Sequence, residues 1–404
     1  MKKLCPLPWL GFSNDPNGMI RPCCISKEHI TKPDGSPYFI QKDSVKDILH
    51  SQYMNNLRTD LQDGKFPKNC EVCWVDEKNG YKSKREIYSD IYKDHIEEFQ
   101  YKTVPEHPID YQLILTNACN LKCRSCGTSH STSWQKEVKS MNITDAESIN
   151  QFPYTLPHKQ PGDKESVFIK DIDTWASSVK RMEVVGGEPF YTEIWEKIWR
   201  YLIDKGYAKE IELAMSTNVT IFNEELIRLL DNNYKALGIG LSIDGMGETF
   251  EYLRKNAKWE DVEQNILKFY KYYKTEAKPS TTFNYTHTTS WIDSYYLPEF
   301  IEWTRKNTPE FRVWINIVHW PVHMNLTTLP DVVKNKIEAK WKNYNWLEYQ
   351  DDINGLIKHM YSVRYTDEQL IAQYKKFTTL DKYRDESTIE LIQENFPEMI
   401  KYFK

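Results

Sequence analysis

The chain has 404 residues, of which 40% are hydrophobic, and its formal net charge is −5. This length suits two domains, or one large domain with appendages. Because the charge is slightly acidic with both signs interspersed, we expect no binding of duplex nucleic acid. No apolar run approaches the about 18 to 20 residues of a membrane span, and no apolar signal region precedes Cys5. We therefore expect a soluble, cytoplasmic protein with no membrane partner.

The eight cysteines fall into two groups, five between Cys5 and Cys73 and three between Cys119 and Cys126. Disulfides are improbable in a chain without an export signal, whereas clustering at ligand spacing indicates metal binding in a reducing compartment.

The first cysteine group begins in a turn-rich segment. Asn17–Gly18 is a typical hairpin turn, so Trp9–Phe12 and Met19–Arg21 are predicted to pair as a small ribbon. This ribbon would bring Cys5 and Cys23 together.

A predicted helix over Ser44–Leu61 follows, and a closely spaced cysteine pair then completes the group. The four ligands could form a tetrahedral site for a fully ligated iron–sulfur cluster or for zinc, and spacing alone does not separate these alternatives. The ligands are Cys5, Cys23, Cys70 and Cys73. Cys24 is left over, and it could replace Cys23, remain a free thiol or act on the substrate.

A domain boundary is predicted at Pro105–Pro108, which cannot continue a helix. Beyond it, strand and helix patterns alternate, as in parallel β/α units. The helix pattern is clear over Thr192–Leu202, where apolar residues recur every four positions. The six predicted strands are Tyr111–Leu115, Arg181–Val185, Glu210–Met215, Ala236–Ile243, Thr281–His287 and Val313–His319.

The second cysteine group follows the first of these strands directly. Cys119, Cys123 and Cys126 place three thiolates within eight residues. Three thiolates can hold a [4Fe-4S] cluster and leave one iron open to a substrate or cofactor. A zinc knuckle completed by a distant histidine is the alternative for this triplet.

A second motif, Gly186-Gly187-Glu188-Pro189, follows the next predicted strand. Together with Cys119-x3-Cys123-x2-Cys126 it resembles the radical S-adenosylmethionine (SAM) superfamily. The resemblance implies a (β/α)6 partial TIM barrel, in which SAM chelates the open iron of the cluster. Reductive cleavage of SAM would then give methionine and a 5'-deoxyadenosyl radical that abstracts a substrate hydrogen. A flavodoxin- or ferredoxin-type electron donor is implied as a partner.

The same resemblance implies residues that hold SAM at the ends of the barrel strands. Gly186, Gly187, Glu188 and Pro189 would hold its amino group. Short polar side chains at the next two strand ends fit its ribose hydroxyls and carboxylate, namely Ser216, Asn218, Ser242 and Asp244. Arg254 could clamp the carboxylate, or it could be a solvated helix arginine.

One position departs from the family pattern. The residue before the last cysteine is often aromatic in this superfamily and packs on adenine, but here it is Ser125. Adenine would have to be held elsewhere, and we expect Val318 and Trp320 at the sixth strand to hold it. The two histidines nearby, His319 and His323, are expected to have structural or hydrogen-bonding roles rather than catalytic ones.

The N-terminal cysteines resemble the auxiliary-cluster modules called SPASM and twitch, on the spacing from Gly18 to Cys23, a helix containing Arg58, and the closing Cys70-x2-Cys73. Such modules usually follow the barrel, whereas this one precedes it. One auxiliary cluster is implied. We therefore predict an N-terminal iron–sulfur domain over 1–105, a radical SAM barrel over 106–325 and a helical C-terminal extension over 326–404. The segment from Thr128 to Asp171 is predicted to be an insertion that covers the substrate.

The predicted function is that of a radical SAM enzyme, an oxidoreductase-type catalyst that modifies a peptide by crosslinking, epimerisation or oxidation. Many relatives with such modules act on peptides, although no peptide-recognition domain precedes Cys5. The first alternative is a radical SAM enzyme acting on a sugar, nucleotide or amino acid. The second is a non-catalytic, zinc-stapled protein that binds single-stranded nucleic acid through its aromatic residues.

Overall fold

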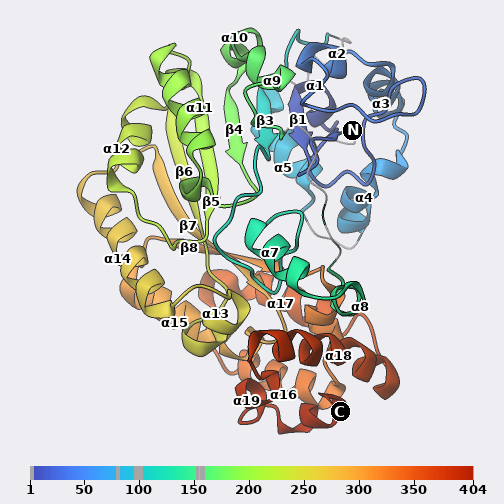
Figure 1. Ribbon diagram of the computed structural model, residues 1–404, viewed down its shortest axis with the longest axis vertical. Helices are drawn as coiled ribbons and strands as arrows, with labels where there is room; N and C mark the ends of the chain where they lie inside the picture. The colour runs from blue at the N-terminus through green and yellow to red at the C-terminus, as the bar shows by residue number, and fades with distance from the viewer. Residues whose placement is uncertain (1–3, 79–81, 95–102, 152–153, 155–159, 404) are drawn as a thin grey trace. The chain divides into compact units, whose positions relative to one another are not determined.

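The structure of the protein is a computed structural model that describes residues 4–78, 82–94, 103–151, 154 and 160–403 (Figure 1). Its eight strands form a mostly parallel sheet. The chain divides into two compact units, the first made of residues 1–117, 155–215 and 225–238 and the second of residues 118–154, 216–224 and 239–404. These units group the chain differently from the three predicted domains, whose boundaries stay a prediction.

The first unit contains one end of the sheet, in the order β2-β1-β3-β4-β5. β1 is parallel to β3 and antiparallel to β2, and β3, β4 and β5 are parallel to one another. The five strands are β1 (Gly11–Asn14), β2 (Ile20–Arg21), β3 (Asp110–Leu113), β4 (Arg181–Val184) and β5 (Glu212–Thr217).

An aromatic cluster on this part of the sheet includes side chains from the helices of the unit. Tyr111 of β3 lies 5.4 Å from Phe12 of β1 and 5.3 Å from Trp175, measured between ring centres. The helices are α1 (Leu7–Leu10), α2 (Val45–Leu49), α3 (Gln52–Gln62), α4 (Glu71–Lys78), α5 (Lys84–Ile91), α9 (Val167–Lys170), α10 (Ile172–Trp175), α11 (Glu193–Asp204) and α12 (Glu224–Asn233).

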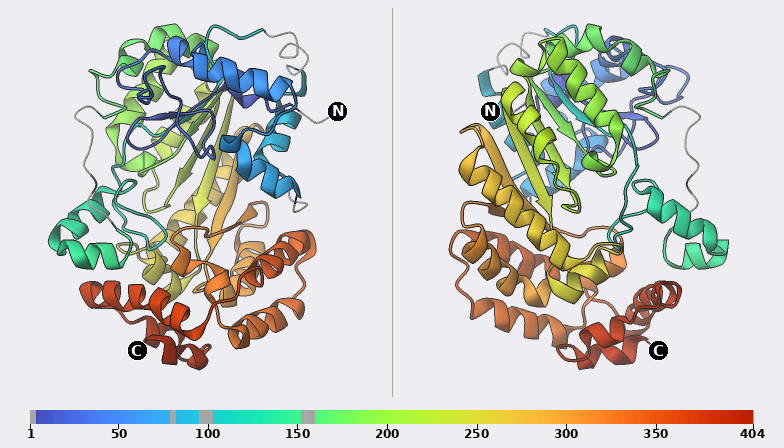
Figure 2. Two further views of the ribbon diagram at one scale, coloured as in Figure 1. Left: turned by 90° about the vertical axis from the view of Figure 1, so that its right-hand side faces the viewer. Right: turned by 60° about the vertical axis from the view of Figure 1, so that its left-hand side comes forward.

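The second unit contains most of β6 (Ala236–Ser242), together with β7 (Thr281–Thr289) and β8 (Arg312–Ile317), of which β7 and β8 are parallel. Burial alternates along β7, as expected for a strand with one face against a core and one face open. Phe269 of α14 contacts Phe283, and Phe300 of α15 contacts Tyr285, on the buried face of β7. Figure 2 shows the gold ribbons of these helices beside the strands of this unit. Helices in this part are α7 (Thr132–Ser140), α8 (Ile143–Ser148), α13 (Gly247–Leu253), α14 (Trp259–Thr275) and α15 (Leu297–Asn307).

The C-terminal residues of the second unit are helical. They form α16 (Asp331–Lys342), α17 (Gln350–Met360), α18 (Asp367–Arg384) and α19 (Thr388–Ile392). α18 begins with a capping box, in which Thr366 and Gln369 exchange both bonds.

Two local predictions are wrong. Trp9 and Leu10 are helical in α1, so the N-terminal ribbon pairs Ser13–Asn14 with Ile20–Arg21 and begins later than predicted. The helix predicted over Ser44–Leu61 is two helices, because Ser44 and Ser51 each cap a new one. The six predicted strands are present, with ends that differ from the predictions by up to two residues.

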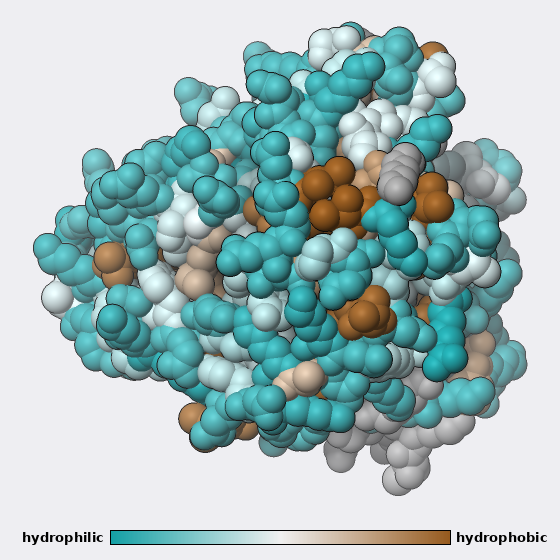
Figure 3. Space-filling view, turned by 90° about the horizontal axis from the view of Figure 1, so that it is seen from below, coloured by the Kyte–Doolittle hydropathy of each residue, from teal (hydrophilic) through white to brown (hydrophobic). Residues whose placement is uncertain are grey.

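No helix of the described residues is long and apolar enough to span a bilayer. Figure 3 shows one face of the molecule, on which hydrophilic side chains predominate and apolar ones gather in small groups. That face therefore offers no broad apolar area to a partner.

Candidate functional site

The four predicted N-terminal ligands surround one cavity in the first unit. Cys5 precedes α1, Cys23 follows β2, Cys70 ends a short 3₁₀-helix and Cys73 lies in α4. All four line the cavity together with apolar side chains and two cations from the start of α5. The apolar lining is Leu7, Ile25, Val72 and Trp74, and the cations are Lys84 and Arg85.

These thiols are chemically suited to a metal centre. Burial raises the pKa of Cys23 to about 11 and that of Cys70 to about 12, so that without a metal both thiols are protonated near neutral pH. A bound metal supplies the positive charge that stabilises the thiolates. Among the described side chains, no three His, Cys, Asp or Glu converge on a single-ion site. A cluster does not need such convergence, because each thiolate binds a different iron.

Cys24 stands apart from these four. It does not line their cavity, and its thiol lies 2.7 Å from the Lys84 ammonium. The choice of Cys23 rather than Cys24 as a ligand stays a prediction, because both cysteines line a second cavity together with Lys84.

Cys119, Cys123 and Cys126 lie in the second unit, in an irregular loop that hydrogen bonds to α7 hold in place. The Ser133 hydroxyl donates to the Cys119 carbonyl at 2.9 Å, and the Trp134 indole donates to the Cys123 carbonyl at 2.8 Å. The loop has no helix or strand hydrogen bonds of its own. It is held by these side chains and by two backbone bonds, from the Lys122 N–H to the Lys255 carbonyl at 3.2 Å and from the Arg124 N–H to the Leu253 carbonyl at 2.8 Å.

Asn218 contacts the same loop from the end of β5. Its amide donates to Asn120 at 2.9 Å and lies 3.9 Å from the Cys119 sulfur. The structure thus brings together one predicted SAM residue and one predicted cluster ligand. Asn120, the partner that links them, was not predicted from the sequence.

Asp244 and Arg254 form a buried ion pair beside the cysteines. Their closest charged atoms are 2.8 Å apart, and the Thr288 N–H donates to the same carboxylate at 2.9 Å. Arg254 is therefore not a solvated helix arginine; it is only 8% exposed, at the end of α13. Within the described part of the chain, its Nε has no hydrogen-bond partner. An unsatisfied, buried donor of this kind fits an anionic ligand such as a carboxylate.

The arginine also acts on the thiols electrostatically. Burial raises the pKa of Cys123, and the Arg254 charge opposes that rise. A cation at this position therefore favours the thiolate that a cluster needs.

The remaining predicted SAM residues of the second unit have mixed surroundings. Ser216 is exposed within β5, Ser242 ends β6 half-buried, and Val318 is 2% exposed just after β8. The two histidines near Val318 differ: His319 is exposed, whereas burial lowers the pKa of His323 to about 3. His323 is therefore a neutral, buried side chain, as a structural role requires.

The Gly186–Pro189 motif lies in the first unit, directly after β4. Gly186 and Gly187 have φ angles of +80° and +61°, which favour glycine. A Cβ on Gly186 would lie 2.7 Å from Cγ2 of Ile114, so this turn has no room for a side chain. Glu188 is 1% exposed and its carboxylate accepts from the Phe190 N–H.

Three charged side chains near the cysteines were not predicted from the sequence. Arg124 lies buried between the second and third cysteines of its loop, Arg384 is buried in α18, and Lys84 contacts Cys24. Only Arg124 carried a signal, as a charge inside the cysteine motif. The other two are distant in sequence from the groups that they contact.

Two family models match this chain. One, described as the radical SAM superfamily, matches residues 113–288, and the other, described as an iron–sulfur cluster-binding (SPASM) domain, matches residues 5–74. The chain carries a radical SAM domain preceded by a SPASM domain. The predicted recognition and the unusual N-terminal position of the SPASM domain are confirmed. These domains support iron–sulfur clusters and SAM as the cofactors.

Individual relatives are distant from this chain. The GTP 3',8-cyclase of Sulfurimonas denitrificans is 26% identical over 161 residues, which are 39% of this chain and 41% of that protein. Native anSMEcpe with bound AdoMet is 20% identical with a TM-score of 0.37, over 60% of this chain and 61% of that one. Streptococcus suis SuiB bound to S-adenosylmethionine is 11% identical with a TM-score of 0.36, over 70% and 58%. The chain thus spans less than two thirds of each relative.

Proposed function

We propose that this radical SAM enzyme cleaves SAM at a cluster held by Cys119, Cys123 and Cys126 and modifies a peptide substrate. The observation that carries the proposal is the buried Asp244–Arg254 pair beside these thiols, with an Arg254 nitrogen still free of a partner among the described residues. A bound cluster and SAM together would supply a carbon-centred radical that abstracts a substrate hydrogen.

The chain's own residues would bind and orient SAM. Arg254 would pair with the SAM carboxylate, while Asp244 fixes the position of the guanidinium. Asn218, Ser216 and Ser242 would contact the ribose, Val318 would contact adenine, and the carbonyls of the Gly186–Pro189 turn would accept from the SAM amino group.

We further propose that the sheet strands form a (β/α)6 partial barrel with a helical C-terminal extension, and that Cys5, Cys23, Cys70 and Cys73 hold one auxiliary cluster. Two features support the second proposal: all four thiols line one cavity, and the SPASM domain model covers them. Many relatives with such modules modify peptides, which supports a peptide as the substrate.

A small-molecule substrate is the second candidate, because a curated relative that matches part of the chain is a GTP 3',8-cyclase. To separate the two, 5'-deoxyadenosine formation would be measured with peptide and small-molecule fractions of a cell extract. We expect the peptide fraction to increase turnover. An increase with the small-molecule fraction alone, or with GTP, would favour the second candidate.

The cofactor assignments are tested by anaerobic reconstitution with iron, sulfide and zinc analysis. We expect about eight irons per chain, four for each of two clusters, and 5'-deoxyadenosine on addition of dithionite and SAM. Alanine at Cys119, Cys123 and Cys126 should leave about four irons and no product. Cys24→Ala is the matched control and should keep both clusters. Zinc in place of iron, without SAM cleavage, would overturn the proposal.

A further inference from the structure

The loop that carries Cys119, Cys123 and Cys126 is joined to the C-terminal helices by buried charges. Arg124 has a side chain that is 2% exposed, and its guanidinium lies 2.6 Å from Asp381 of α18 and pairs with Glu386 just beyond this helix. The same guanidinium stacks on Tyr252, 3.7 Å from the ring centre. One loop residue thus contacts two acids that lie more than 250 positions away in the sequence.

A second contact runs in the opposite direction, from α18 to the loop. Arg384 is fully buried, donates to the Lys122 carbonyl at 3.0 Å and pairs with Glu137 of α7 at 2.7 Å. It also lies over Trp134, whose indole holds the Cys123 carbonyl. Arg384 therefore joins the loop, α7 and α18 at one point.

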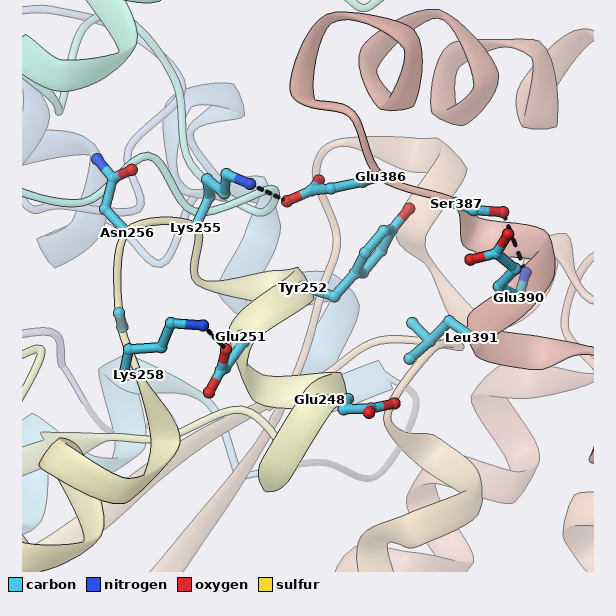
Figure 4. A pocket seen from close by; sticks show the side chains of 11 residues that line it. Glu248, Glu251, Tyr252, Lys255, Asn256, Lys258, Glu386, Ser387, Glu390 and Leu391 are labelled. Carbon is cyan, nitrogen blue, oxygen red and sulfur yellow. Dashed lines mark hydrogen bonds and ion pairs between the residues drawn. The ribbon is translucent and has the colours of Figure 1, made fainter.

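The acids of this contact are fixed by their own neighbours. Asp381 accepts from the N–H and the hydroxyl of Thr388, at 2.7 and 2.6 Å, and from the Tyr252 hydroxyl at 3.0 Å. Glu386 also pairs with Lys255 at 2.7 Å, at the edge of a cavity of about 430 Å³ (Figure 4). Because these acids are themselves held in place, they fix the position of the Arg124 guanidinium.

These contacts matter because the loop has little structure of its own. It must hold three thiols at fixed positions, and a ligand site needs support from residues outside it. Buried charges supply such support, since moving either partner leaves an unpaired charge at low dielectric.

We propose that the C-terminal helices α18 and α19 position the cysteine loop of the radical SAM domain, with Arg124 and Arg384 as the positioning residues. The identity of the group that the loop holds rests on the proposed function. The loop holds its cluster in the geometry that binds SAM only when the C-terminal helices are packed against it.

The test compares wild-type protein with Asp381→Asn/Glu386→Gln, which leaves Arg124 without acidic partners. Hydrogen exchange of residues 118–127 is measured, together with iron content and the electron paramagnetic resonance spectrum of the reduced cluster before and after SAM addition. In the double variant we expect about tenfold faster exchange in this loop and a weakened spectral response to SAM. Lys382→Gln, an exposed change on the same helix, should match wild type in all three measurements.

A conservative change separates positioning from mere folding. Arg124→Lys keeps the charge but cannot span both acids, so it should give faster loop exchange and an altered spectrum with most of the iron retained. If the double variant does not fold, this single variant decides. Unchanged exchange and an unchanged SAM response in the variants that fold would overturn the proposal. Exchange needs no SAM cleavage, so a wild-type protein without 5'-deoxyadenosine would count against the proposed function only.

Discussion

The turn after β4 has no room for a side chain at Gly186. Alanine there must adopt a φ of +80° and would put its Cβ 2.7 Å from Ile114. Gly206 offers a matched comparison, since its φ is +77° but nothing lies within 4 Å of the position that a Cβ would take. We expect Gly206→Ala to lower the free energy of unfolding by about 1 kcal/mol and Gly186→Ala by about 1 to 3 kcal/mol more.

Urea unfolding of both variants measures this difference. Ile114→Ala in the Gly186→Ala background removes Cγ2 of Ile114, the atom that the new Cβ would meet, and should recover part of the lost free energy of unfolding. Equal stability of the two single variants would show that the turn accommodates a side chain, contrary to the geometry.

For single residues, the sequence indicated which side chains are functional candidates better than it indicated which residues those side chains contact. Cys119, Cys123 and Cys126 are recognisable because their spacing is local. Arg254 was a candidate for the SAM carboxylate, but its pairing with Asp244 depends on the fold, which brings the end of β6 against the end of α13. Arg384 gave no signal, because its contacts lie far away in the sequence.

Elements with strong local signals were predictable, and their connections were less so. Thr192 caps α11 and its apolar residues repeat with the helix period, so this helix matched its prediction. The break between α2 and α3 needed the recognition of a second cap at Ser51, inside an otherwise helical pattern. That β1 joins the main sheet beside β3 could not be read locally, since strand pairing is set by tertiary contacts.

The two helices beside the auxiliary cysteines are joined by a bidentate pair. Arg85 of α5 donates to both carboxylate oxygens of Glu77 of α4, at 2.8 and 2.6 Å, and lies over Trp74. Because α4 also carries Cys73, the Glu77–Arg85 pair helps to hold the helix of a predicted ligand in place. We expect Glu77→Gln to lower the free energy of unfolding by about 2 kcal/mol and to release iron from the auxiliary site.

Iron retained after gel filtration, with stability from urea unfolding, measures both effects. Asp90→Asn on α5 is the control, because its ion pair with Lys82 is about half exposed and should contribute less than about 1 kcal/mol. Full iron retention in Glu77→Gln would mean that α4 holds Cys73 without α5.

For the whole molecule, the sequence predicted a helical C-terminal segment and a cysteine-bearing barrel but no connection between them. The charges that join α18 to the cysteine loop come from residues such as Asp381, which on the sequence alone resembles any acid of a surface helix. Burial decides its role, and burial is a property of the whole fold. Ion pairs between residues that are far apart in the sequence could therefore not be predicted from this sequence.

Two histidines, the buried His323 and the half-buried His359, make the stability of the second unit depend on pH. Burial, with a smaller contribution from nearby cations, lowers the pKa of His323 to about 3 and that of His359 to about 4. The cations are Arg124 and Lys376 for His323, and Lys334 for His359, which also faces His319. Unfolded histidine titrates near 6.5, so below that pH the unfolded chain binds protons that the folded chain does not.

The contribution of these neutral histidines to the free energy of unfolding is therefore fully present above about pH 6.5, and it is lost as the pH falls toward their pKa values in the folded protein. For His323, which is 7% exposed, we expect a loss of up to about 1.4 kcal/mol per pH unit below this point. Urea unfolding between pH 7.5 and about pH 5 measures the slope, above the range in which most carboxylates titrate. His323→Asn should flatten it, whereas His130→Asn, an exposed change, should not. A slope unaffected by His323→Asn would assign the acid sensitivity to other groups.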